Sequence, residues 1–282
     1  MILTLNRDRL FRMLKGICVH LVLLIGAFFA LFPFVWMVLT SLKSYIEASA
    51  AQSFFPTQWL FSNYIQAWNM VGLFPRYFVN TIFMSVTTTL GVLVTSSLAG
   101  YAFARMHFPG RDVLFIILLS TMMVPFEVTV IPNFILMRQL HWIDTYQALI
   151  IPWTASAFSI FLLRQFFRAI PSELYDAAVL DGSTHLQFLW SIVLPLSKPA
   201  LITSALFTFL GNWNSLMWPL LVTNNPMMRP LQVGIISFIT DSGTYIQYLL
   251  AAVTISIIPV IVIYFFLQHW FIEGVAKVGI RG

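Results

Sequence analysis

Charged residues are scarce in this chain. Only 9% of its 282 residues are Asp, Glu, Lys or Arg, against about 25% in soluble proteins. Hydrophobic residues make up 59%, more than one water-soluble core can hide, so a lipid environment is the simpler interpretation. The basic residues form no cluster of the kind that binds nucleic acid. We therefore expect a membrane protein with no nucleic-acid partner.

Cysteine and histidine are also few. The single cysteine, Cys18, lies in an apolar stretch, which excludes a disulfide framework within this chain. The five histidines are scattered, and none has a second ligand at metal-site spacing. We expect no metal site and no cofactor in this chain.

Long uncharged gaps predict the membrane spans, since a transmembrane helix needs about 20 mainly apolar residues. Six gaps qualify, one of them broken only by Glu127, and they predict spans at about residues 16–41, 77–104, 113–136, 146–167, 199–222 and 248–270. A seventh gap, 47–76, contains too many polar residues, prolines and glycines for a lipid-facing helix, and is interpreted as a loop with short amphipathic pieces. The predicted fold is an all-α membrane domain of six transmembrane helices over residues 1–282.

The N-terminal stretch also resembles a signal peptide, because basic residues precede an apolar run and Ala48-Ser49-Ala50 mimics a cleavage site. The apolar run extends from Gly16 to about Ser41, whereas a signal peptide has about 7–15 apolar residues. A retained first span is the favoured interpretation.

Lysine and arginine are distributed unevenly between the predicted loops. Six spans place both termini on one side, and the side richer in cations is expected to be cytoplasmic. With the N-terminus inside, eleven cations are cytoplasmic: Arg7, Arg9, Arg12, Lys15, Arg105, Arg111, Arg164, Arg168, Lys198, Lys277 and Arg281. Four lie outside: Lys43, Arg76, Arg138 and Arg229. We therefore predict cytoplasmic termini.

The densest acidic cluster lies in the longest predicted cytoplasmic loop, 172–196, where Glu173, Asp176 and Asp181 fall within nine residues. Ser172 is a candidate N-cap for a first short helix, which Gly182 ends. Thr184 with Gln187 forms a capping-box pattern that starts a second helix. The segment is predicted to be two short amphipathic helices near the membrane surface, whether or not a partner covers them.

The spacing in this loop resembles the EAA loop of ATP-binding-cassette (ABC) importer permeases, whose pattern is acid-Ala-Ala-x3-Gly-x9-Ile-x-Leu-Pro. Here the pattern reads Asp176, Ala177, Ala178, Gly182, Ile192, Leu194 and Pro195, with aspartate in place of the usual glutamate. Further stretches resemble the carbohydrate branch, of the maltose and glycerol-phosphate importer type. These are Val124–Glu127 through Ile131-Pro132, Ile143–Thr145 with Ala148–Ile150, Asn212–Asn214 with Trp218–Leu221, and Phe271–Gly282.

The resemblance implies a function and a set of partners. In this family the hairpin, here Glu173 and the seven motif residues, docks on a cytoplasmic ATPase subunit and converts ATPase motion into alternating access. The sequence contains no G-x-x-x-x-G-K-[ST] loop, so ATP and Mg²⁺ are expected on two partner ATPase subunits. The other expected partners are a second permease, usually a different chain, an extracytoplasmic solute-binding protein and membrane lipid. The expected location is the bacterial inner membrane.

Polar and aromatic residues inside the predicted spans are candidates for the substrate path, because such groups are costly in a bilayer. Glu127 is expected about 22 Å along a helix from Asp112, past the membrane midplane. Amides bind hydroxyl groups and indoles pack on sugar faces, which makes Asn212, Trp213, Asn214 and Trp218 candidates for contact with a sugar-like solute. Ordinary helix packing is the alternative for each.

Two other function classes remain as alternatives. An ion- or proton-coupled secondary transporter would need an intramembrane ionisable relay, and only Glu127 lies well inside a span. An intramembrane enzyme would need a catalytic or metal constellation within the spans, and the sequence has none.

Overall fold

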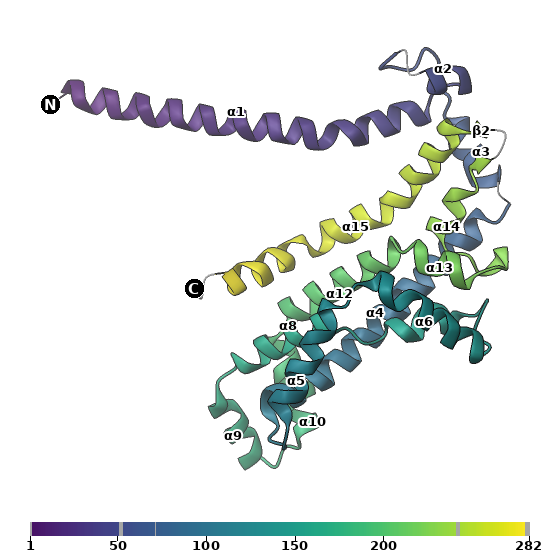
Figure 1. Cartoon of the computed structure of the whole chain (residues 1–282). Coiled ribbons are helices and arrows are strands. Elements are labelled where there is room, and N and C mark those ends of the chain that lie inside the picture. Colours follow the sequence, from purple (N-terminus) through teal and green to yellow (C-terminus); the bar gives the residue numbers. More distant parts are fainter. Residues whose placement is uncertain (1, 51–52, 71, 241–242, 280–282) are drawn as a thin grey trace. The chain divides into compact units, whose positions relative to one another are not determined.

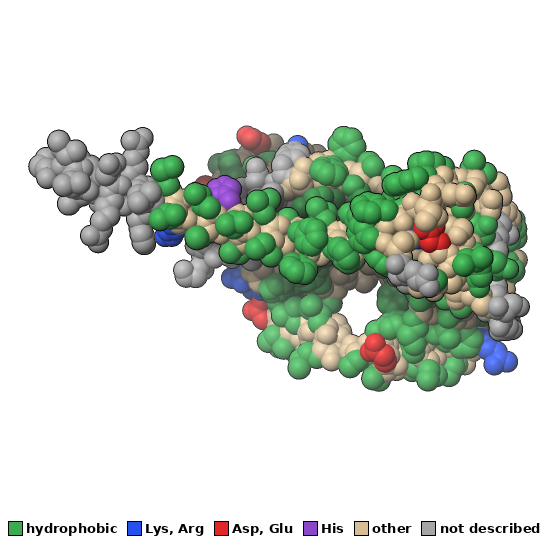
Figure 2. Space-filling model, turned by 90° about the horizontal axis from the view of Figure 1, so that it is seen from above, with side chains coloured by type: hydrophobic (Ala, Val, Ile, Leu, Met, Phe, Trp, Pro, Cys, Tyr) green, Lys and Arg blue, Asp and Glu red, His purple; other side chains and the backbone are tan. Residues whose placement is uncertain are grey.

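The computed structural model describes the backbone of residues 2–50, 53–70, 72–240 and 243–279, and the side chains of residues 13–50, 53–69, 72–239 and 243–268. Of the predicted cytoplasmic cations, Arg281 lies outside the described residues, as do the side chains of Arg7, Arg9, Arg12 and Lys277. Hydrophobic side chains cover most of the face shown in Figure 2, which agrees with a lipid-facing surface.

The described chain divides into two compact units, residues 1–70 with 238–255 and residues 71–237 with 256–282. The first unit holds α1 (Ile2–Ser41), α2 (Tyr45–Ala50), α3 (Ser62–Met70), the antiparallel pair β1 (Ile239–Thr240) and β2 (Gly243–Thr244), and the start of α15 (Ile246–Gly279). A buried polar turn closes α1, because Asn63 Nδ2 donates to the carbonyl oxygens of Ser41 and Lys43, each at 2.8 Å. The short helices α2 and α3 agree with the loop predicted at 47–76.

The second unit is built around α4, and it holds the remaining elements. Its first half contains α4 (Phe74–Arg105), α5 (Arg111–Ser120), η1 (Thr121–Met123), α6 (Phe126–Gln139), α7 (Tyr146–Ile150), η2 (Ile151–Trp153) and α8 (Ala157–Arg168). Its second half contains α9 (Ser172–Leu180), α10 (His185–Phe188), the π-helical η3 (Leu189–Val193), α11 (Leu194–Leu196), α12 (Lys198–Trp213), α13 (Met217–Val222), η4 (Pro226–Met228), α14 (Leu231–Ile236) and the rest of α15.

Helix α4 packs against α8 and α12 (Figure 1). Its buried face carries small residues, among them Ser85, Thr88, Ser96 and Gly100, which let helices approach closely. At Gly100 an added Cβ would lie 3.3 Å from the backbone nitrogen of Arg164 and from Leu163 Cβ. The helices α4 and α8 therefore pack closely at this position, and a side chain here would require its neighbours to shift by a few tenths of an ångström.

Three helices in the described part are long and apolar enough to cross a membrane: Met13–Ser41, Phe74–Arg105 and Ile246–Gln268. Three bent helix pairs raise the number of candidate spans to at most six, if each pair counts as one span. Two of these pairs fall on the predicted spans 113–136 and 146–167, with bends of 99° and 40°, and the third, with a bend of 82°, joins residues 185–196 to α12. The predicted span 199–222 is itself interrupted between α12 and α13.

The bend at Pro125 corrects the prediction that one straight helix runs from Asp112 to Glu127. The chain leaves η1 at Val124 in an extended conformation, and Pro125 precedes α6 because its fixed φ and missing N–H break the helix. A distance counted along one straight helix from Asp112 to Glu127 is therefore wrong. Glu127 instead lies exposed in the first turn of α6.

Candidate functional site

The hairpin of residues 172–196 (the hairpin, below) lies at one end of the second unit, where Figure 1 shows α9 and α10 together. Helix α9 ends in a Schellman motif, in which Gly182 N donates to Val179 O at 3.0 Å and Ser183 N donates to Ala178 O at 2.9 Å. Gly182 has a φ of +80°, which a residue without Cβ adopts at least cost. The predicted glycine break is confirmed in this geometry.

The predicted capping box is present at the start of α10. Thr184 Oγ1 accepts from Gln187 N at 3.3 Å, and Thr184 N donates to Gln187 Oε1 at 2.7 Å. The predicted N-cap at Ser172 is wrong. Pro171 takes the extended conformation before the helix, and Ser172 is already its first helical residue, without a side-chain capping bond.

A buried cluster fixes the hairpin to α4 and α8. Its members are almost fully inaccessible: Tyr101, Leu163, Phe167, Ile170, Ala178, Phe188, Leu189, Val193 and Ala200. Of the motif residues, Ala178 is buried, and Ile192 and Leu194 pack partly buried against the cluster. The cluster therefore joins both hairpin helices to α4 and α8 by close packing.

Polar contacts reinforce this attachment. Tyr101 Oη is 2.9 Å from His185 Nδ1, and Tyr175 stacks on the same imidazole at a ring distance of 5.4 Å. Arg105, in the last turn of α4, donates to the carbonyl oxygens of Phe167 (2.8 Å from Nη2) and Ile170. Phe167 lies in the last turn of α8 and Ile170 just after it, where the last C=O groups of the helix have no intrahelical partner.

The opposite face of the hairpin is exposed and mixes acids with apolar side chains. Glu173, Asp176, Asp181, Ala177, Gly182 and Pro195 are all exposed. Beside them, Leu180 is 89% exposed and Trp190 is 60% exposed. Such a mixture suits a protein partner in water, because carboxylates are poorly placed against lipid.

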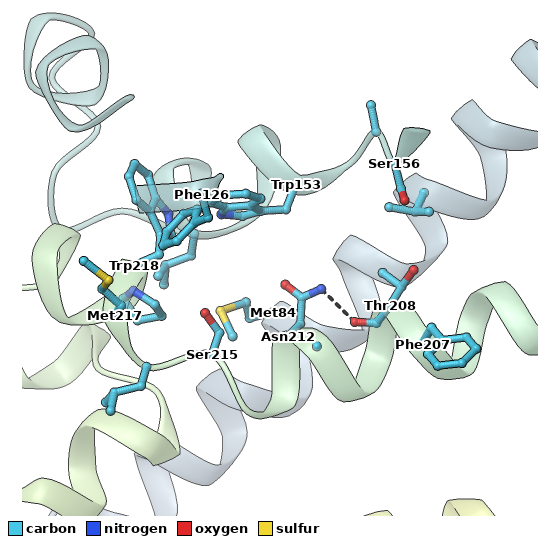
Figure 3. A pocket seen from close by; sticks show the side chains of 16 residues that line it. Met84, Phe126, Trp153, Ser156, Phe207, Thr208, Asn212, Ser215, Met217 and Trp218 are labelled. Carbon is cyan, nitrogen blue, oxygen red and sulfur yellow. Dashed lines mark hydrogen bonds between the residues drawn. The ribbon is translucent and has the colours of Figure 1, made fainter. Parts of the chain in front are cut away.

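A cavity of about 480 Å³ lies elsewhere in the second unit, where α4, α6, α12 and α13 come together (Figure 3). Its lining residues are Met84, Val92, Phe126, Leu149, Trp153, Ala155, Ser156, Phe207, Thr208, Gly211, Asn212, Ser215, Leu216, Met217, Trp218 and Pro219. A cavity of this size is within the usual range for small-molecule sites, about 300–1,000 Å³.

An aromatic group forms one wall of the cavity. The ring of Trp153 lies 5.7 Å from Phe126 and 5.6 Å, edge to face, from Trp218. The Trp218 indole N–H donates to Ala148 O at 2.8 Å, which fixes the ring in place. Figure 3 shows Asn212 on α12 across from these rings, with Nδ2 directed to Thr208 O at 2.9 Å.

The structure separates the five predicted path residues. Asn212 and Trp218 line the cavity, whereas Trp213, Asn214 and Glu127 are not among its lining residues. Trp213 is buried on another side of α12, where its indole N–H donates to Ser256 O at 3.1 Å and its ring stacks on Phe209. Asn214 is exposed at the end of α12 and donates to Leu210 O at 2.9 Å.

Sequence reasoning missed Trp153, Thr208, Gly211 and Ser215 as cavity residues. A partial signal exists, because Thr208, Gly211 and Asn212 recur at spacings of three and four and so share one face of α12, whereas Ser215 follows the end of that helix. Nothing in the local sequence marks Trp153, which lies at the bend between η2 and α8.

Comparisons with known proteins cover both the hairpin and the cavity residues from Val92 to Pro219. Residues 87–277 match the family described as binding-protein-dependent transport system inner membrane component. The chain is 35% identical to the sn-glycerol-3-phosphate transport system permease protein UgpE of Yersinia pestis, over 90% of this chain and 94% of that protein. It is 33% identical to the arabinooligosaccharides transport system permease protein AraQ of Halalkalibacterium halodurans, over 91% of this chain and 93% of that protein.

A solved structure is also similar. It is a chain from the crystal structure of a bacterial ABC transporter involved in the import of the acidic polysaccharide alginate, with a TM-score of 0.82 and 30% identity. The match covers 94% of this chain and 97% of that chain.

Proposed function

The chain belongs to the family of binding-protein-dependent transport system inner membrane components and is a permease subunit of an ABC importer. We propose that it carries a sugar or sugar-like solute inward by alternating access. Two of the similar permeases are named for arabino-oligosaccharide and glycerol-phosphate transport, which supports a carbohydrate-type solute.

The hairpin is the coupling element in this proposal, and one observation carries it. The motif residues lie on a hairpin that is fixed to α4 and α8 by a buried cluster and that presents an exposed acidic and apolar face. An ATPase subunit that binds this face can move the helices as rigid bodies, which is one established form of conformational switching. Glu173, Asp176, Ala177 and Gly182 are proposed to contact that subunit.

The proposed assembly contains a second, different permease, two ATPase subunits that bind ATP and Mg²⁺, and an extracytoplasmic solute-binding protein. We place the hairpin and both termini in the cytoplasm, with the excess of Lys and Arg on the inner loops as support. Asn212 and Trp218 are proposed to line the solute path, since both border the cavity.

The coupling role is tested by reversing one charge on the hairpin. We expect Asp176→Lys, in the complete complex reconstituted in proteoliposomes, to insert and assemble but to lose solute-stimulated uptake, because a cation replaces the acid at the proposed docking face. Asp181→Lys is the matched control, since Asp181 is also exposed on the same hairpin but lies outside the motif. Normal uptake by Asp176→Lys would rule out docking at this position, and equal losses in both variants would indicate a general charge effect.

A further inference from the structure

The cavity has no charged wall. Among its described lining residues none is Asp, Glu, Lys, Arg or His, and the polar ones are Ser156, Thr208, Asn212 and Ser215. We infer that this cavity binds an uncharged, hydroxyl-rich sugar and selects against phosphorylated and carboxylated solutes. The inference rests on the proposed function and narrows its solute class.

An anion in this cavity would lack the partners that anions need. Phosphate and carboxylate groups are usually held by Arg or Lys or at a helix N-terminus. Removing an ionised group from water without such a partner is strongly unfavourable. Similar permeases are named for transport of glycerol 3-phosphate, and the similar solved structure is of an importer of acidic alginate. Both of these solutes are anions, so a cavity without charged residues sets this chain apart in the solute class that it binds.

Three helix N-termini border the cavity, and none offers a strong anion site. Helix α8 begins after Ser156, a lining residue, but the Ser156 hydroxyl already caps this end by accepting from Ser159 N at 3.2 Å. Helix α6 begins at Phe126, but Glu127 in its first turn already places a carboxylate at that positive end. Helix α13 (Met217–Val222) has only six residues, too few to build a substantial dipole.

The two walls match the two kinds of surface on a sugar ring. Phe126, Trp153 and Trp218 supply an apolar aromatic wall for the C–H face of a pyranose or furanose. On the other side, Asn212 Nδ2 donates to Thr208 O. That bond uses only the amide nitrogen, so Asn212 Oδ1 accepts from a sugar hydroxyl. Ser215 beside it supplies a hydroxyl that both donates and accepts.

Gly211 allows the cavity to be filled without disturbing the fold. A Cβ built on Gly211 meets no atom within 4 Å, so a large side chain there extends into open space that the solute would occupy. Gly26 in α1 is the matched control, since a Cβ there also meets nothing within 4 Å and α1 lies outside the unit that holds the cavity.

The experiment uses the complete complex with its binding protein and measures ATP-driven uptake of four labelled probes: maltose, arabinobiose, glycerol 3-phosphate and a diuronate. We expect uptake of a neutral sugar and no uptake of the two anions. Gly211→Trp should lower neutral-sugar uptake by about tenfold or more, since loss of about 1.4 kcal/mol of binding corresponds to tenfold. Gly26→Trp should transport as the parent does.

Equilibrium binding of the same probes to the complex without the binding protein separates selection by the cavity from selection by the binding protein. Anion binding equal to that of the neutral sugars, or parental uptake by Gly211→Trp, would overturn the inference and leave the importer function standing. Absence of ATP-driven uptake for all four probes would instead overturn the proposed sugar-import function.

Discussion

The hairpin and the cavity are built in different ways by the same chain. The hairpin is one continuous segment, and its turn depends on bonds between residues a few positions apart, such as those around Gly182 and Thr184. The cavity gathers side chains from Met84 to Pro219 and exists only because bent helices bring them together. The first kind of site depends on local geometry, and the second on packing across the whole unit. Single substitutions should therefore act differently in the two regions.

The largest effect is expected from Gly182→Val. A β-branched residue at φ +80° costs about 1–3 kcal/mol, so the native hairpin turn is lost from most molecules and uptake should fall by about tenfold to a hundredfold. Gly110→Val is the matched control, because Gly110 has a φ of +79° and equally open surroundings but lies before α5. The amount of solute taken up per ATP hydrolysed would be measured for both variants. An equal fall in this ratio in Gly182→Val and Gly110→Val would mean that backbone strain alone explains the defect.

A smaller effect, confined to solute handling, is expected from Asn212→Leu. Removing the amide from the cavity wall should lower neutral-sugar uptake by about threefold to tenfold, the usual range for one hydrogen bond at a ligand site. The matched change Asn214→Leu, two residues away and outside the cavity lining, should lower uptake by less. The Michaelis constant and the maximal rate of uptake would be measured for both, and a larger loss in Asn214→Leu would place the solute path elsewhere.

The hairpin was readable from the sequence because its determinants are local. Gly182 predicted the glycine break and the Thr184–Gln187 pair predicted the capping box, and both are present. The error at Ser172 arose because a serine at the first helical position looks the same in sequence as an N-cap, and only the extended Pro171 backbone separates the two.

The cavity was only partly readable, for a geometric reason. Asn212 and Trp213 are adjacent in α12, where consecutive residues point about 100° apart, and Trp213 lies on the side of the helix that packs on Ser256 and Phe209. Sequence reasoning grouped them because both are polar or aromatic, whereas the structure places only Asn212 at the cavity. Trp153 and Phe126 reach it through bends of 40° and 99°, which a straight-span prediction does not include.

A pair of tyrosine changes compares the attachment of the hairpin with a contact elsewhere in the unit. Tyr101→Phe removes the hydroxyl that lies 2.9 Å from His185, and Tyr146→Phe removes the one that donates to Asn80 Oδ1 at 2.7 Å. Each should cost about 1 kcal/mol, a typical net value for one hydrogen bond, and lower the thermal midpoint of the complex slightly. Only Tyr101→Phe should also lower uptake per ATP hydrolysed. Equal coupling in both variants would mean that this bond stabilises the fold without serving the hairpin.

The smallest effect is expected from Glu127→Gln. This variant tests whether the Glu127 carboxylate contributes to the solute path, and whether uptake is driven by ATP or by a proton gradient. Glu127 is exposed in the first turn of α6 and is not among the cavity residues, so losing its charge should change uptake by no more than about twofold, as for a typical surface charge.

A secondary transporter would instead need this carboxylate, because it was the ionisable group predicted well inside a span. Uptake driven by ATP alone, and by a proton gradient alone, would be compared in parent and variant vesicles. Gradient-driven uptake that disappears in Glu127→Gln would favour proton coupling over the ABC mechanism, whereas ATP-driven uptake at the parental level would leave the hairpin as the coupling element.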